Sequence, residues 1–97
     1  MTKSLYATMR AHPDHKAHVA ELLTALAQDV RAEPGCVRFV VYTLADDPLL
    51  FHVEETYRDD DAFRAHMGTA HGRAFNAAIA DLVEGGASTV VFLDQVA

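Results

Sequence analysis

The spacing of apolar residues changes repeatedly along the chain, and the order of these changes constrains the fold more than any other feature. Apolar residues at alternate positions predict strands at residues 5–10, 36–44, 50–57 and 89–93. Apolar residues three and four positions apart predict a long helix between His12-Pro13-Asp14 and Glu33-Pro34-Gly35. The same spacing predicts a short helix that starts at Asp59 and another that starts at Thr69.

The predicted order is strand, helix, strand, strand, helix, helix, strand. This order is typical of the α+β class and of the ferredoxin-like split βαβ plan, in which an antiparallel four-stranded sheet carries helices on one face. Asp46-Asp47-Pro48 is predicted to form a turn, Gly68 to separate the two later helices, and Gly85-Gly86 to end the second of them. The 97 residues are expected to form a single domain, because a second core would not fit.

Two of the predicted strands carry large apolar side chains on both faces, although the helices would cover only one. Leaving four or five such groups in water would forgo about 1.5–3 kcal/mol each. A contiguous apolar patch usually marks a partner surface. We therefore predict a homodimer in which two sheets pack face to face. On the strand at residues 36–44, one face carries Val37, Phe39 and Val41 and the other carries Val40 and Tyr42. On the strand at residues 89–93, one face carries Val91 and Leu93 and the other carries Val90 and Phe92.

Composition excludes several classes of partner. The formal net charge of −6 opposes binding to phosphate backbones and to anionic membranes, so neither nucleic acid nor a membrane is an expected partner. The single Cys36 has no partner for an internal disulfide, and no signal peptide is recognisable. We predict a cytoplasmic location.

His66 is the first candidate for chemistry. It shares the apolar face of its helix with Phe63 and Met67, so it is expected to point toward the sheet. Two interpretations remain open at this point. The residue is either a core histidine that bonds a backbone carbonyl, or a general base in a mostly apolar pocket.

Glu55 and Tyr57 lie two residues apart on one face of the third strand. If that face is solvated at the strand's end, the pair has no special role. If it faces the helices, an ionised Glu55 needs a partner, and it would orient or charge-balance a histidine while Tyr57 holds a substrate oxygen.

Other histidines are weaker candidates. His71 lies in the first turn of its helix, where it is either solvated or contacts a substrate oxygen. His12, His15 and His18 are spaced like metal ligands on a helix, but no third ligand follows at a fitting distance, so no metal site is predicted. Phosphate-binding loops and the Gly-x-Ser-x-Gly nucleophile motif are absent from the sequence.

Four segments together resemble the antibiotic biosynthesis monooxygenase (ABM) superfamily. They are Glu33-Pro-Gly-Cys-Val-Arg-Phe39, Glu55-Thr-Tyr57, Ala62-Phe-Arg-Ala-His66 and Thr69-Ala-His71. The superfamily pattern is similar to Glu-Pro-Gly-Cys-x-Arg-Tyr, Glu-x-Trp/Tyr and Ala-His-x-x-Ser/Thr-Pro-His. Two departures are Ala70, where Pro is usual, and Gly72, where an aromatic residue often follows.

The resemblance implies a dimeric α/β barrel with one pocket per subunit. Some members oxygenate quinols and polycyclic phenols without a cofactor, whereas others degrade haem or isomerise a phosphorylated autoinducer. The haem branch fits poorly, because the chain has no Trp and Asn76 stands where a histidine would fall. The isomerase branch shares a histidine like His66 and a strand with Arg38-Phe39, but the negative charge disfavours a phosphorylated substrate.

The function expected from the residues and the resemblance together is a monooxygenase that needs neither cofactor nor metal and acts on a small aromatic diol or quinol with O2. His66, paired with Glu55, would remove a phenolic proton, while Tyr57 and His71 hold the oxygens and Arg38 contacts the substrate. The alternatives are an isomerase that uses the same histidine without oxygen, and a non-catalytic binding module. The pocket walls are expected to be Phe51, Val53, Phe63, Met67, Phe75 and Ile79.

Overall fold

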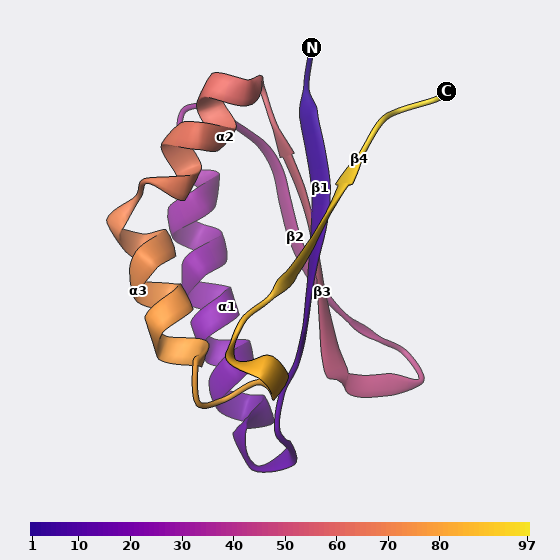
Figure 1. The fold of residues 1–97 in the computed structure, drawn as a ribbon, viewed down its shortest axis with the longest axis vertical. Helices are drawn as coiled ribbons and strands as arrows, with labels where there is room; N and C mark the ends of the chain where they lie inside the picture. The colour runs from indigo at the N-terminus through magenta and orange to yellow at the C-terminus, as the bar shows by residue number, and fades with distance from the viewer.

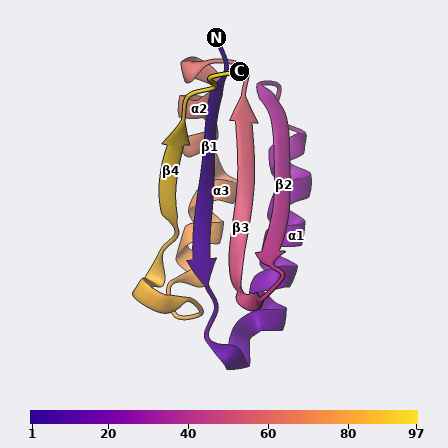
Figure 2. The ribbon, with the colours of Figure 1, turned by 90° about the vertical axis from the view of Figure 1, so that its right-hand side faces the viewer.

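The strands and helices predicted from the sequence occur in the predicted order in a computed structural model that describes residues 1–97. Four antiparallel strands form one sheet in the order β2-β3-β1-β4, and three helices cover one face of it (Figures 1 and 2). The elements are β1 (Lys3–Arg10), η1 (Pro13–His15), α1 (Lys16–Arg31), β2 (Cys36–Leu44), β3 (Asp47–Tyr57), α2 (Asp60–Met67), α3 (Ala70–Ile79), η2 (Glu84–Gly86) and β4 (Thr89–Leu93).

The core lies between the helices and the sheet face that they cover. Alternate residues of β1 and β3 point into it, because successive side chains of a strand point to opposite faces. The apolar stripe of α1 packs against this face from the other side. The strand residues are Leu5, Ala7 and Met9 on β1, and Phe51, Val53, Glu55 and Tyr57 on β3.

Two side-chain caps fix the junction between the later helices. The Asp59 carboxylate accepts a hydrogen bond from the Ala62 backbone N–H at 2.8 Å, and the Thr69 hydroxyl oxygen accepts one from Gly72 N–H at 3.2 Å. The Thr69 hydroxyl also donates to the carbonyl of His66 at 2.8 Å. Both predicted helix starts are therefore confirmed, and α2 and α3 are held at a tight corner.

Two predicted boundaries are wrong. The hairpin turn contains only residues 45 and 46, so Asp47 and Pro48 belong to β3. Asp47 is held there by two hydrogen bonds from Arg10, at 2.9 and 2.6 Å. The last helix ends at Ile79 and does not extend to Gly85-Gly86. Beyond Ile79 the backbone is no longer helical, because the Leu82 carbonyl accepts a hydrogen bond from His12 N–H at 2.9 Å.

An irregularity in β2 changes which side chains share a face. Cys36 pairs with Tyr57 and Arg38 with Thr56, so Val37 is an extra residue in this strand. Val37 is 62% exposed and does not share the covered face with Phe39, contrary to the alternation expected from the sequence.

The other face of the sheet carries no helix (Figure 2). Tyr6 and His52 stack there with ring centroids 4.7 Å apart, beside apolar side chains of β2 and β4. We refer to this surface as the open face; its main side chains are Tyr6, Val40, Tyr42, His52, Val91 and Leu93. No helix of the structure is both long and apolar enough to cross a membrane.

Candidate active site

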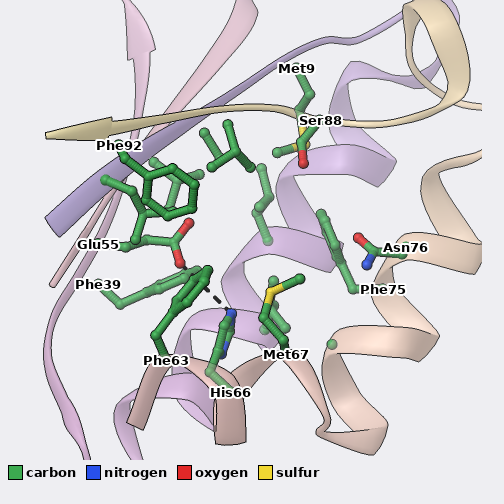
Figure 3. A pocket seen from close by; sticks show the side chains of 17 residues that line it. Met9, Phe39, Glu55, Phe63, His66, Met67, Phe75, Asn76, Ser88 and Phe92 are labelled. Atoms are coloured by element: carbon green, nitrogen blue, oxygen red, sulfur yellow. Dashed lines mark ion pairs between the residues drawn. The ribbon is translucent and has the colours of Figure 1, made fainter. Parts of the chain in front are cut away.

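A cavity of about 290 Å³ lies between the helices and the covered face of the sheet. Most of its wall is apolar, and aromatic rings from β2, α2, α3 and β4 surround it, namely Phe39, Phe63, Phe75 and Phe92. Figure 3 shows Glu55 and His66 approaching the cavity from β3 and α2, while Asn76 and Ser88 lie farther along the wall. An apolar cavity with a few convergent polar groups is the usual form of a small-molecule site.

Six of the side chains predicted for the site line this cavity, namely Val53, Glu55, Phe63, His66, Met67 and Phe75. Phe51 and Ile79 do not, so their assignment to the wall is wrong. Phe51 is 3% exposed and Ile79 is 0% exposed, and both are packed within the hydrophobic core. Residue spacing identifies the inward face of an element, but the cavity extends along only part of each element.

Arg38 does not reach the cavity, so its prediction as a substrate contact is wrong. Phe39 points toward the helices, and the preceding residue of the strand therefore points to the open face. There the Arg38 guanidinium donates a hydrogen bond to the Tyr42 hydroxyl at 3.2 Å.

Tyr57 supports Glu55 from behind. The tyrosine is fully buried, does not line the cavity, and donates its hydroxyl hydrogen to Glu55 Oε1 at 2.7 Å. This contact satisfies one oxygen of a carboxylate that is only 7% exposed. Tyr57 is therefore placed to position Glu55 and does not itself contact the cavity.

A second glutamate, Glu33, joins the two candidate histidines. Its carboxylate oxygens lie 3.0 and 3.2 Å from His66 Nδ1, and Oε2 lies 2.6 Å from His71 Nε2. We call these three residues the Glu33 cluster. Their side chains are 12%, 12% and 27% exposed for Glu33, His66 and His71.

Sequence reasoning missed Glu33 as a site residue. The Glu33-Pro34-Gly35 segment was predicted only to end the first helix, and it does follow the last turn of α1. The chain then folds so that residue 33 meets the end of α2 and the first turn of α3. The one available signal was its place in the Glu-Pro-Gly motif of the resemblance.

His66 is held between two carboxylates. Nδ1 faces Glu33, and Nε2 lies 3.8 Å from Glu55 Oε1 on the cavity side. The ring also packs against Tyr57 with centroids 4.8 Å apart. When Nδ1 donates its hydrogen to Glu33, the lone pair of Nε2 is left toward Glu55 and the cavity, which is the arrangement of a general base.

Comparison with known proteins agrees with this architecture. A sequence profile described as antibiotic biosynthesis monooxygenase matches residues 4–78, which is most of the chain. The chain belongs to the ABM family. No curated protein matches the sequence of this ABM chain.

Solved structures similar to the ABM chain include Rv0793 from Mycobacterium tuberculosis, with 26% identity, a TM-score of 0.92, and coverage of 100% of this chain and 97% of that one. PA3566 from Pseudomonas aeruginosa is 30% identical, with a TM-score of 0.90 and coverage of 99% and 95%. A structure described as an antibiotic biosynthesis monooxygenase is 26% identical, with a TM-score of 0.90 and full coverage of both chains. These matches confirm the ferredoxin-like α+β fold, and the ABM family supports a monooxygenase-type activity.

Burial shapes the electrostatics of this ABM site. The pKa of Glu55 is raised from its ordinary value of 4.5, chiefly because burial disfavours the charged form, although the Tyr57 hydrogen bond opposes the shift. The pKa of Tyr57 is raised far above its ordinary range by burial and by the neighbouring Glu55. Tyr57 therefore remains a hydrogen-bond donor throughout the physiological pH range.

Replacing Glu55 with glutamine is expected to stabilise the ABM chain at neutral pH. The folded-state pKa of Glu55 is raised, so the folded protein binds this proton more tightly than the unfolded chain, and stability falls as pH rises from about 4.5 through the raised value. Glutamine removes that loss and still offers an oxygen to Tyr57. In urea titrations between about pH 4 and pH 8, the free energy of unfolding of the wild type should fall increasingly below that of Glu55→Gln as the pH rises. Parallel pH profiles for the two proteins would contradict this account.

Proposed function

We propose that the chain is a cofactor-independent monooxygenase that acts on a small aromatic diol or quinol with O2 as co-substrate. The observation that supports this most directly is the orientation of His66. Its Nδ1 is paired with Glu33, while its Nε2 lies beside Glu55 at an apolar cavity. A base in such a cavity has access to a phenolic proton while water is excluded.

The chemistry begins when His66 Nε2 removes a proton from the substrate hydroxyl. The resulting anion is electron-rich and transfers one electron to O2, and the radical and superoxide combine at a ring carbon. The peroxide anion takes the proton back from His66 on its outer oxygen, and the resulting hydroperoxide loses this oxygen together with the hydrogen of the same ring carbon as water. One atom of O2 stays in the product as a carbonyl and the other leaves as water. The protein supplies deprotonation, orientation and a dry cavity.

The dimensions of the cavity favour a small substrate. At about 290 Å³ it lies near the lower end of the usual range for ligand pockets, which is roughly 300–1,000 Å³. Phe39, Phe63 and Phe92 offer faces and edges to an aromatic ring. Glu33 would act through His66 as a positioning residue, and Tyr57 through Glu55.

Oxygen uptake with a panel of hydroquinones and catechols tests the proposal. The purified protein should consume O2 in proportion to product formed, and the reaction should stop when O2 is removed. Turnover that continues without O2 would instead support the isomerase, which uses the same histidine. Saturable binding of the aromatic compounds without any turnover would support the binding module.

We also propose that the open face packs against the same face of a second chain. Tyr42, Val91 and Leu93 are 45%, 37% and 43% exposed there, although all three are large and apolar or aromatic. Burial of such a surface stabilises association. The cytoplasmic location remains a prediction.

A charge placed on the open face is expected to dissociate this dimer. Val91→Glu puts a carboxylate where the two sheets would meet, and an unpaired buried charge is strongly unfavourable. Gln28→Glu on the exposed side of α1 adds the same charge away from that face and is the matched control. Sedimentation analysis should find a dimer for the wild type and for Gln28→Glu, and a monomer for Val91→Glu. A monomeric wild type would contradict the proposal.

A further inference from the structure

We propose that the Glu33 cluster is a binding site for one divalent first-row transition ion. Glu33, His66 and His71 each offer one ligand atom, and these atoms all lie within 4.8 Å of one another. They come from the loop after α1, the last turn of α2 and the first turn of α3. No metal site was expected from the sequence, because Glu33 lies 33 and 38 residues before the two histidines.

The ligand types match the ion. Two imidazoles and one carboxylate form the protein ligand set of many zinc sites with an open position, and of two-histidine-one-carboxylate iron sites. Ligand atoms around a tetrahedral Zn²⁺ stand about 3.3 Å apart when each bond is about 2.0–2.1 Å long. The Glu33–His66 contact of 3.0 Å is near this spacing, and the Glu33–His71 contact of 2.6 Å would have to widen by about 0.7 Å. The ligand atoms all lie within 4.8 Å of one another, so side-chain movements of up to about 1.5 Å would bring the set to the spacing that the ion requires.

The surroundings provide access and support. Glu33 lines a second hollow of about 260 Å³, together with Arg58, Asp61 and Thr69, whereas His66 lines the main cavity. Glu33 is the member of the cluster that faces this hollow, so an ion that enters there meets its carboxylate first. His66 Nε2 also lies 3.8 Å from Glu55, and a carboxylate behind a metal-bound histidine fixes the orientation of its ring.

Metal binding and the proposed function compete for the same ring. An ion bound at His66 Nδ1 leaves the ring hydrogen on Nε2, so this nitrogen has no lone pair with which to remove a phenolic proton. This consequence depends on the proposed function, whereas the metal site itself does not. If both hold, a saturating ion should suppress oxygen uptake.

Titration of tag-free, chelator-treated protein with Zn²⁺ and Co²⁺ tests the site. Calorimetry should give one Zn²⁺ per chain, and Co²⁺ should produce visible absorption bands characteristic of nitrogen and oxygen ligands. His71→Ala and Glu33→Gln should each weaken Zn²⁺ binding by more than about ten-fold. These readouts do not involve turnover, so failure of the metal site is distinguishable from failure of the proposed function.

A histidine pair elsewhere provides the matched control. His12 and His15 lie at the two ends of η1, with their ring centroids 6.4 Å apart. This pair is the most obvious alternative site at which Zn²⁺ could bind non-specifically. The double variant His12→Ala, His15→Ala should bind Zn²⁺ as the wild type does. Loss of binding in this variant, or no saturable binding at one ion per wild-type chain, would overturn the proposal. If a cluster variant does not fold, the Co²⁺ spectrum of the His12→Ala, His15→Ala protein remains decisive, because the competing histidine pair is absent from it.

Discussion

Replacing His66 with alanine should lower the rate of O2 consumption with an active quinol by about 10²–10⁴-fold, which is the usual contribution of a positioned general base. His66 is the one imidazole that lines the cavity. His66→Gln provides a second variant, because its amide can donate to Glu33 but cannot take up the phenolic proton. Both variants should show the loss mainly in kcat, since the apolar walls that bind the ring remain.

The controls for this experiment separate chemistry from folding. His12→Ala removes an exposed histidine from the end of the sheet and should leave turnover unchanged. Circular dichroism should confirm that the His66 variants are folded. Wild-type rates in a folded His66→Ala protein would remove the base from the proposed mechanism. For Glu33, partial recovery of the rate in Glu33→Asp relative to Glu33→Ala would identify the effect of its carboxylate on His66.

Replacing Gly35 with alanine should both destabilise the fold and impair the site. A β-carbon at this position would overlap the Cβ of Ala62 and lie 3.3 Å from its Cα, in the first turn of α2. Overpacking of this kind costs about 1–3 kcal/mol. The displaced α2 carries His66, and Glu33 lies only two residues before the substitution, so the contact between them should lengthen. Displacement by about 1 Å is enough to lower a rate by about 10²-fold.

Gly68 provides the matched glycine. Its φ of −90° suits any residue, and a β-carbon there would lie no closer than 3.6 Å to a neighbouring atom. Gly68→Ala should therefore be neutral or stabilising by up to about 1 kcal/mol. Urea titrations of both variants, with oxygen uptake measured in parallel, would contradict the close-packing argument if the two substitutions behaved alike.

Much of the fold follows from local signals in the sequence. Side-chain alternation in β1 and β3 and the caps Asp59 and Thr69 are short-range features, and each occurs as expected. The errors arise where a distant partner decides the outcome. Pro48 lies in a strand because Arg10 anchors the neighbouring Asp47, and the last helix ends early because Leu82 bonds His12.

The candidate site was less predictable, for the same reason. The inward direction of His66 could be read from periodicity, whereas the sequence left open whether Glu55 faces the helices or solvent. Glu33 could not, because its contacts to His66 and His71 join residues 33 and 38 positions apart. Tyr57 was expected to hold a substrate oxygen but lies buried behind Glu55, and depth within a core cannot be read from alternation alone.

One consequence follows from the position of β4. This five-residue ribbon is bonded only to β1, yet it supplies Val90 and Phe92 to the cavity. The histidine and its glutamates sit on segments that are secured from several directions. Figure 3 shows the Phe92 side chain of β4 beside Glu55, so this strand borders the part of the cavity where the proton-transfer groups lie. A change of residue size at Phe92 therefore alters the room for a substrate and the surroundings of Glu55 together, so selectivity and reactivity are coupled at this strand.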